Sequence, residues 1–528
     1  KAPIPKSRSP VSSPTVIRTA WLRLVLLQGA LLVCALLSLP IAAASDTWRL
    51  SLSDSIEHAL RNNRELQVAR VVPELGRLAL SSAYAFYDPQ LIVSARTESA
   101  ADSGGFDPND FSRDAIYDAD STLADVGLAG VLPSGLTYSL SGSYAASEGE
   151  RNYLNFDSYK FFAGGQIQQP LLRNLWIDQP RLTIRVSRHQ LRISEFGVSY
   201  LTMDIVNRVQ QAYYELVRAR RDLEIRQDLL DTKRQFLAGT QRKIDVGMLT
   251  AQDGLVAQAQ VAIQQSQLLL ASNLVQLAEH DLRLLLGDFA TNRSSVGILP
   301  TDRPLVVPER CDIDESWQRG LTQRPDLLQI HEEIASAKDQ IRFARNQLFP
   351  SLDLVAGYNR RGASAVQTYP PTRAEASLTD AWDQLADGVA PTEMVGVVLA
   401  VPLGLSAERA AYRASRRLEA QAQLRLQQKR EIVMREIADA VVSARSGWER
   451  VRAARSATLL ARQALEAEER KLAGGKSEMF IVLQMQNDFA LARSAEVLAE
   501  ADSQKALSQL HFAEGSLLER LRIRIEFE

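Results

Sequence analysis

Cysteine, histidine and aromatic residues are all scarce in this chain. Its 528 residues include 2 cysteines and 5 histidines, and aromatic side chains make up 6% of the total. The histidines lack metal-ligand spacing with one another and with Cys311, so we expect no metal site. If Cys34 is removed with a leader segment, one thiol remains and no internal disulfide can form. The abundance of Ala, Leu, Gln, Arg and Glu favours long helices over a compact aromatic core.

An excess of charge of either sign is also missing. The 61 basic and 63 acidic residues are mixed along the sequence rather than grouped in blocks. Net charge therefore suggests neither nucleic acid nor an anionic membrane surface as a partner. The sequence contains no nucleophile elbow, no HExxH-type helix and no convincing carboxylate pair, so we expect no enzyme activity and no cofactor.

One long apolar run is present, and it lies near the N-terminus. Residues 24–39 follow a basic start and lead into a small-residue ending at Ala44, which predicts a secretory signal peptide over 1–44 with cleavage after Ala44. An uncleaved anchor is the alternative, although the run is shorter than the roughly twenty apolar residues of a membrane helix. Lipid attachment at Cys34 is a further alternative, which Val33 disfavours because a small residue is expected there. The rest of the sequence offers no membrane helix, so entry into a membrane would require a closed β-barrel.

The chain contains an internal repeat. Segment 59–66 resembles 320–327, and the sequence around Pro89 resembles that around Pro350 at the same offset. Further correspondences pair Pro170 with Pro402, Gly247 with Gly475 and Gly287 with Gly515. The offset shortens along the chain, which indicates a longer loop region in the first copy. Two copies of one structural unit therefore fill the mature chain.

Apolar residues recur every seven positions in two long series. These are Val209, Leu216, Leu223, Leu230, Leu237 and Ile244, then Leu249, Val256, Ile263, Leu270, Leu277 and Leu284. In the second copy the first register is kept by Ile437, Val451, Leu465 and Leu472. This period predicts left-handed supercoiled helices packed along a seam. A helix from near Arg181 to near Val246 would be roughly 100 Å long at ~1.5 Å per residue, so we expect an elongated molecule.

Two regions alternate between apolar and polar residues, as β-strands do. The apolar members are Leu136, Tyr138, Leu140 and Tyr144 in one region, and Leu352, Leu354, Ala356 and Tyr358 in the other. Residues 133–135 (Pro-Ser-Gly) predict a hairpin turn before the first of these runs. A soluble sandwich would show the same alternation. The export signal and the lack of a membrane helix favour a membrane barrel instead.

The order of these elements resembles the TolC-like outer membrane factor family over residues 46–520. The resemblance is carried by the strand opening at 349–352, the strand-to-helix junctions at 169–172 and 401–403, and the hairpin tips at 245–253 and 473–477. It implies an α+β membrane protein with two internal structural repeats. In this family a shared outer-membrane β-barrel, with four strands from each subunit of a homotrimer and twelve in all, continues into a long periplasmic α-helical barrel of coiled-coil hairpins.

The resemblance also implies a function and a set of partners. The protein would be the outer-membrane channel-tunnel subunit of a bacterial tripartite efflux or type I secretion system, and it would conduct substrates passively to the exterior. Its partners would be outer-membrane lipid, a periplasmic adaptor and an inner-membrane transporter. An exported coiled-coil scaffold and a periplasmic adaptor without its own channel are the alternatives. The scaffold does not account for the strands, and an adaptor would show one helical hairpin rather than two.

The plan divides the chain after the signal peptide into four parts. They are a first repeat at 45–287 (a helix at about 53–86, strands at about 89–169, a helical hairpin at 171–287), a linker at 288–313, a second repeat at 314–520 (a helix at about 314–348, strands at about 350–402, a helical hairpin at 404–515) and a tail at 521–528. Extra strand material at about 124–146 is expected either to form an extracellular hairpin or to lengthen existing strands.

Candidate functional residues lie at the strand–helix junctions and at the far helical tips. The junction prolines are Pro89, Pro170, Pro350 and Pro402, of which Pro170 and Pro402 are expected to introduce the long helices. At the first tip, Gly247 is expected to end one helix, while Thr250 and Asp253 form a capping box for the next. Asp253 either serves as that cap alone or, by the resemblance, also joins a polar network that holds neighbouring hairpins closed.

The second tip departs from the family pattern. The family often places two acidic residues on the helix after the tip glycine, Gly475, but this chain has Ile481 and Gln484 there. A constriction at this tip is therefore expected to be less acidic, or to be formed by other residues such as Asp488. Both tips, 244–254 and 472–488, are expected to gate the tunnel and to receive the adaptor. The sequence leaves the cargo open.

Overall fold

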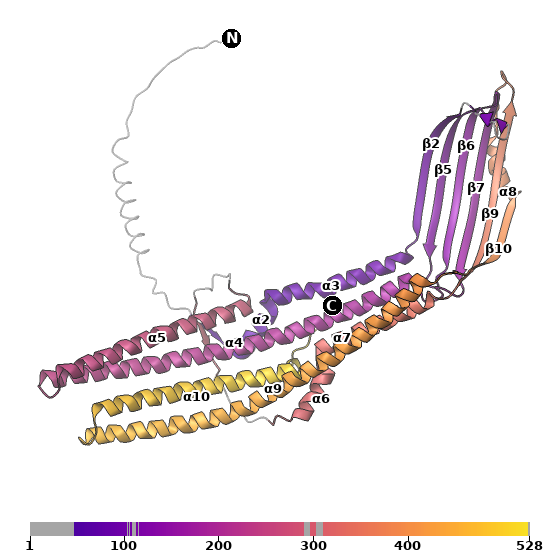
Figure 1. The fold of residues 1–528 in the computed structure, drawn as a ribbon. Coiled ribbons are helices and arrows are strands. Elements are labelled where there is room, and N and C mark those ends of the chain that lie inside the picture. The colour runs from indigo at the N-terminus through magenta and orange to yellow at the C-terminus, as the bar shows by residue number, and fades with distance from the viewer. Residues whose placement is uncertain are drawn as a thin grey trace, which may run out of the picture.

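The molecule is elongated, with one sheet at one end and helical turns at the other (Figure 1). The computed structural model describes residues 47–102, 104, 106–107, 112–113, 116–289, 296–302 and 310–525. The predicted signal peptide and Cys34 lie outside the described residues. Within the described segments, no helix combines the length and apolarity needed to cross a lipid bilayer.

Each repeat begins with two helices rather than the single one expected. In the first repeat α2 (Leu52–Asn62) is followed by α3 (Arg64–Tyr84), and in the second α6 (Ile313–Gln323) is followed by α7 (Pro325–Asn346). The breaks fall at Asn63 and Arg324, whose ψ angles are 122° and 124°. Asn63 accepts a hydrogen bond from Leu66 N at 3.0 Å and so caps α3. Arg324 precedes a proline, which favours extended backbone.

Four long helices form two hairpins. They are α4 (Gln179–Asp245) with α5 (Ala251–Leu286), and α9 (Ser406–Ala473) with α10 (Met479–Glu514). At ~1.5 Å per residue, the 67 residues of α4 span about 100 Å. The return helices α5 and α10 both end at a left-handed glycine, Gly287 and Gly515, each with φ of 77°. A short parallel pair, β1 (Trp48–Leu50) and β8 (Ile298–Pro300), and the last helix α11 (Leu517–Arg520) lie near the middle.

Pro170 does not introduce a helix as expected. It is the last residue of a strand, and α4 begins nine residues later, where Asp178 accepts a hydrogen bond from Arg181 N at 2.9 Å and Pro180 occupies the first turn. The N-terminal proline of the helix is thus Pro180. Pro402 likewise lies before the first turn of α9, which starts at Ser406.

The large sheet has six antiparallel strands in the order β10-β9-β7-β6-β5-β2. In chain order they are β2 (Gln90–Asp102), β5 (Tyr117–Val131), β6 (Thr137–Arg151), β7 (Leu154–Pro170), β9 (Ser351–Thr368) and β10 (Pro391–Ala400). A separate ribbon pairs β3 (Phe106–Asp107) with β4 (Ser112–Arg113), and a single 3-10 turn, η1 (Ala85–Tyr87), precedes β2.

The material expected at about 124–146 takes a different form from either alternative considered. It forms two complete strands, β5 and β6, inserted in the sheet between β2 and β7. The predicted turn joins them, with Leu132 N donating to Leu136 O at 2.7 Å and Gly135 at φ 86°. The chain therefore supplies six strands to its sheet, not the four that the resemblance implied.

The helix between β9 and β10 was not expected. The segment between β9 and β10 contains α8 (Leu378–Asp387), which packs against β9 and β7. Ser377 Oγ accepts a hydrogen bond from Asp380 N at 3.1 Å and caps this helix, and Gly388 ends it with φ of 69°. The approach to the sheet is close, because a Cβ at Gly362 would lie 1.9 Å from Ala381 O.

The two seven-residue series behave differently. Val209, Leu216 and Leu230 of the first series are buried, as are Ile437 and Val451 in the second repeat, so these residues form the core seam. The α5 series does not. The α5 residues buried against α4 include Ala257, Gln264, Ala271, Val275, Ala278 and Leu282. The small residues in that set let the two helices approach closely, and the longer side chains of the predicted series remain outside.

Candidate functional site

The six-stranded sheet has chemically distinct faces. Paired residues in antiparallel strands share a face, which fixes the assignment from the register. One face, here called the apolar face, carries Leu91, Val93, Val126, Leu128, Leu140, Tyr144, Phe161, Ile167, Leu354, Val395 and Val397. Towards the end of the sheet away from the long helices, the same face carries Asp120, Glu148, Asp157, Arg360 and Glu393, and α8 packs on it through Trp382 against Phe161. The other, the polar face, carries Ser94, Arg96, Ser121, Asp125, Ser139, Ser141, Ser143, Gln166, Gln168, Asp353 and Arg361 among fewer apolar residues. Such a sheet suits a boundary between lipid and water.

Both edges of this sheet are open. Strand β2 pairs on one side with β5, and β10 pairs on one side with β9, which leaves one ladder of each without a partner in the described chain. These edges are long and apolar, since Leu91 is 67% exposed and Val395 is 80% exposed. An uncovered edge of this kind needs another strand beside it. The chain alone therefore does not complete the structure that its sheet requires.

A stripe of bare apolar side chains runs along α5. Its members, here called the α5 stripe, are Val256, Ile263, Leu270, Leu277 and Leu284, which are 47–66% exposed. Their seven-residue spacing is that of a coiled-coil seam, yet the described chain places no helix over them. Like the sheet edges, the α5 stripe is left uncovered by the described residues.

A polar network joins the two helical hairpins where α4 meets α10. Asn207 Nδ2 donates to Gln509 Oε1 at 2.9 Å, and Ser508 Oγ donates to Asn207 Oδ1 at 2.7 Å. Closer to the tips, Ser494 Oγ donates to Asp222 Oδ1 at 2.6 Å. These hydrogen bonds satisfy polar groups that would otherwise be stranded between helices. They hold the hairpins side by side.

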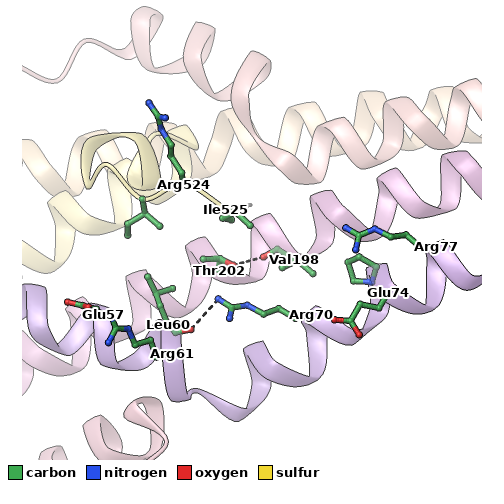
Figure 2. A pocket seen from close by; sticks show the side chains of 12 residues that line it. Glu57, Leu60, Arg61, Arg70, Glu74, Arg77, Val198, Thr202, Arg524 and Ile525 are labelled. Carbon is green, nitrogen blue, oxygen red and sulfur yellow. Dashed lines mark hydrogen bonds and ion pairs between the residues drawn. The ribbon is translucent and has the colours of Figure 1, made fainter. Parts of the chain in front are cut away.

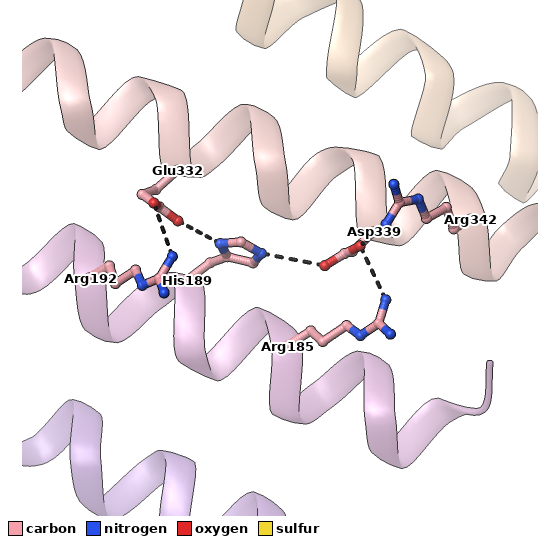
Figure 3. Close-up of polar contacts among 6 residues, drawn as sticks. All are labelled: Arg185, His189, Arg192, Glu332, Asp339 and Arg342. Carbon is pink, nitrogen blue, oxygen red and sulfur yellow. Dashed lines mark hydrogen bonds and ion pairs between the residues drawn. The ribbon is translucent and has the colours of Figure 1, made fainter. Parts of the chain in front are cut away.

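An ionic cluster fixes α7 on α4 (Figure 3). His189 lies between two carboxylates, with Nδ1 2.6 Å from Glu332 Oε2 and Nε2 3.4 Å from Asp339 Oδ2. Arg192 adds a contact to Glu332, and Arg185 adds one to Asp339, each at 3.4 Å. The cluster orients the helices beneath the strands. We assign it a positioning role.

The first tip has the turn chemistry expected from its sequence. Gly247 has φ of 77° and ends α4, while Thr250 and Asp253 form a reciprocal capping box at the start of α5. Asp253 Oδ2 accepts hydrogen bonds from Thr250 N at 2.9 Å and from Thr250 Oγ1 at 2.7 Å. Because these bonds favour the charged form, the pKa of Asp253 lies below its usual range. These contacts are local to one turn, so a gating role for Asp253 stays a prediction.

The second tip lies at the same end of the molecule as the first (Figure 1). Gly475 turns the chain with φ of 71°, and Ser477 Oγ donates to Glu468 Oε1 at 2.5 Å. The hydrogen bonds from Lys471 and Ser477 lower the pKa of Glu468. The three candidate constriction residues, Ile481, Gln484 and Asp488, are all exposed at the beginning of α10.

The junction prolines lie at the ends of strands at the helical side of the sheet. Pro89 immediately precedes β2 and Pro350 immediately precedes β9, whereas Pro170 ends β7 and Pro402 follows β10 after one intervening residue. A proline at a strand end removes no ladder hydrogen bond. The structure therefore brings these four residues to one level, and it places them about a helix length away from the tip residues.

A basic cavity of about 550 Å³ lies near the middle of the molecule, between α2, α3, α4 and the C-terminal segment (Figure 2). Its lining includes Arg61, Arg70, Arg77 and Arg524 together with Glu57 and Glu74. Arg61 is paired with Glu57 at 2.5 Å, and Arg70 donates to the Leu60 carbonyl at 3.2 Å. Among the described residues, no group of His, Cys, Asp and Glu side chains could hold a metal ion. We find no arrangement here that indicates catalysis.

Comparison with known proteins gives consistent results. A model of the family described as outer membrane efflux protein matches residues 115–288 and 317–516. Among solved structures, the CmeC outer membrane channel of Campylobacter jejuni is 15% identical, covers 88% of this chain and 86% of its own, and has a TM-score of 0.62. The outer membrane protein VceC of Vibrio cholerae is 17% identical, with coverages of 88% and 96% and a TM-score of 0.61. The open-state MtrE outer membrane channel of Neisseria gonorrhoeae is 15% identical, with coverages of 88% and 89% and a TM-score of 0.60.

Proposed function

Because the chain belongs to the outer membrane efflux protein family, we propose that it is the passive channel subunit of a tripartite efflux or type I secretion system. Its signal peptide would direct export and be cleaved after Ala44. Its strands would insert in the bacterial outer membrane, and its helices would extend into the periplasm. An inner-membrane transporter and a periplasmic adaptor would deliver cargo to the helical tips. The repeat boundaries at 45–287 and 314–520 are part of the same proposal.

The observation that carries this function is the incompleteness of the single chain. The two open edges of the sheet and the α5 stripe all demand a partner, and copies of the same chain supply one for each. With the apolar face toward lipid and the polar face toward water, copies joined edge to edge enclose a water-filled lumen. The family resemblance supplies the number of copies, which is three.

Assembly can be tested with neighbouring residues on one helix. Leu277 belongs to the α5 stripe, whereas Gln276 is also exposed but lies about 100° away around the helix. The proposed assembly should migrate as a heat-sensitive oligomer on electrophoresis without boiling. Leu277→Glu should abolish that oligomer, because it would bury a charge in the seam between copies. Gln276→Glu adds the same charge and should leave the oligomer intact. A stable oligomer in both variants, or a soluble monomer for the unmodified protein, would refute the assembly.

Gating by the tips follows from the same proposal. Tips 244–254 and 472–488 would narrow the tunnel and contact the adaptor, with Asp253, Ile481, Gln484 and Asp488 at the constriction. Cysteines introduced near Asp253 and Gln484 should block export when oxidised and restore it when reduced. Undiminished export after complete crosslinking would contradict the gate while leaving the channel itself in place.

A further inference from the structure

We propose that the β5–β6 hairpin is part of the barrel wall, so that the channel has eighteen strands and admits hydrophilic solutes too large for a twelve-stranded barrel. This rests on the proposed homotrimer, with six strands from each copy. Barrel diameter grows roughly linearly with strand number, so the exit would be about 1.5-fold wider. Figure 1 shows β5 and β6 between β2 and β7 in one continuous sheet.

The pairing of the hairpin is continuous. Every residue of β5 from Tyr117 to Val131 has a partner in β6, and β6 is paired with β7 from Thr137 to Arg151. On the other side, β2 is paired along its whole length with β5 rather than with β7. Moving the hairpin out of the wall would break two complete ladders, and β2 and β7 would have to move together and pair with each other to close the sheet again.

The side chains of the hairpin also continue both faces. Val126, Leu128 and Leu140 extend the apolar face from β2 towards β7. On the opposite face β6 presents a row of hydroxyl groups, Ser139, Ser141, Ser143 and Ser147, next to Gln166 and Gln168 of β7. In a hairpin exposed to water on both sides, nothing would favour apolar side chains on one face and hydroxyl groups on the other. The inserted part of the lumen is rich in hydrogen-bonding groups and also carries Asp125 of β5, which suits hydrophilic solutes.

The turn of the hairpin is seated on the junction between β7 and α4. Gln169 Nε2 donates to Ser134 O at 3.2 Å. A Cβ at Gly135 would lie 3.2 Å from Pro170 Cγ and 3.4 Å from Asn174 O, so the turn packs tightly there. The hairpin is thus anchored at the rim where the strands meet the helices. It extends the wall along its full height.

The perimeters of the two parts of the channel agree better with eighteen strands. Four helices from each of three copies, spaced by about 8–10 Å, give a tunnel perimeter of about 96–120 Å. Eighteen strands spaced by about 4.8 Å and tilted by about 40° give about 113 Å, whereas twelve give about 75 Å. A wall of eighteen strands therefore joins the helices without a narrow neck.

A deletion tests the strand count. Strands β5 and β6 run in opposite directions, so removal of 117–151 leaves β2 and β7 antiparallel and able to pair directly. Imaging of the purified trimer in lipid nanodiscs should show eighteen strands in the unmodified channel and twelve in the variant. When neutral polymers are added from the extracellular side, the largest one that enters the variant should have a diameter about 1.5-fold smaller than the largest one that enters the unmodified channel. Entry from that side reports the barrel rather than the distant tips.

A second test avoids the deletion. Cysteines at Leu140 and Ser141 are adjacent on β6, and a charged, membrane-impermeant thiol reagent should modify Ser141→Cys but not Leu140→Cys in the assembled channel. A trimer with twelve strands, or modification at both positions, would overturn the eighteen-stranded wall and leave the proposed function standing. A failure of the unmodified chain to form a trimer would instead reject the proposed function, and the wider exit with it.

Discussion

Arg324 donates two hydrogen bonds to Asp326, from Nε to Oδ1 at 3.0 Å and from Nη2 to Oδ2 at 2.7 Å, across the break between α6 and α7. The arginine also donates to Glu436 Oε2 at 2.7 Å on α9 and to the Ala513 carbonyl at 3.2 Å on α10. Lys429 of α9 forms an ion pair with the same aspartate, with 3.0 Å between Nζ and Asp326 Oδ2. Arg324 is 1% exposed, so a single buried guanidinium connects four helices of the second repeat.

Loss of the aspartate should therefore be costly. Asp326→Asn leaves Arg324 buried with part of its charge uncompensated, and we expect a loss of about 3–5 kcal/mol in the free energy of unfolding. Glu466→Gln removes the exposed partner of Arg462 and should cost about 0–1 kcal/mol. Denaturant unfolding of the detergent-solubilised protein compares the two variants. Equal denaturation midpoints for the two variants would show that the buried pair contributes no more to stability than the exposed pair.

The same pair predicts an acid dependence of stability. Burial raises the pKa of Asp326, but hydrogen bonds and charge from Arg324 and Lys429 outweigh it, and the pKa lies below the ordinary value of 3.8. A lowered pKa in the folded state means that the stabilisation is complete above the unfolded-state value and is lost as pH falls through the folded-state value. The melting temperature of the unmodified protein should decrease as the pH is lowered below about 4. Asp326→Asn should show a shallower decline over that interval, and parallel curves would contradict the assignment.

The first tip should loosen when its cap is removed. Asp253→Ala removes the acceptor of both Thr250 hydrogen bonds and half of the reciprocal capping box. Amide hydrogen exchange in the first turn of α5 should become faster, while exchange near Ala271 stays unchanged because that part of the helix is packed against α4. Asp245→Ala, at the exposed end of α4, is the matched control. Equal exchange in both variants would argue against the cap.

The seat of α8 on the sheet depends on one glycine. Gly362→Ala places a Cβ 1.9 Å from Ala381 O, so the helix must move away from β9. The ring of Trp382 packs edge-on against the ring of Phe161, with 5.4 Å between the ring centroids. The fluorescence of Trp382 should shift when this contact opens. Gly357→Ala on the same strand meets its nearest atom at 3.5 Å and should leave the spectrum unchanged. An unshifted spectrum in Gly362→Ala would show that α8 is not held there.

Local turn chemistry was predictable from the sequence because few alternatives exist. Gly247 and Gly475 sit at positive φ in the two tips, and the spacing of Thr250 and Asp253 suffices for a capping box. The repeat and the long helices also follow from periodicity. The break before Pro325 could have been found from the proline itself, and α8 from the serine before it and the glycine after it.

The remaining features depend on contacts that a pattern does not encode. The period of seven on α5 identifies a seam but does not say which helix covers it, and the chain buries Ala257, Ala271 and Ala278 against α4 instead. The alternation of β5 and β6 likewise indicates strands without fixing their neighbours. Arg324 looks like an ordinary surface arginine in sequence, and its burial follows only from the convergence of α6, α7, α9 and α10.

An up-and-down pair such as β5 and β6 starts and finishes at the same rim, so it adds circumference without disturbing any helix that follows it. Channel calibre in this architecture can change in increments of one hairpin per subunit, while the rods and their far ends keep their geometry. The first repeat has such an increment and the second does not. Exit width and entrance control can consequently change independently of each other.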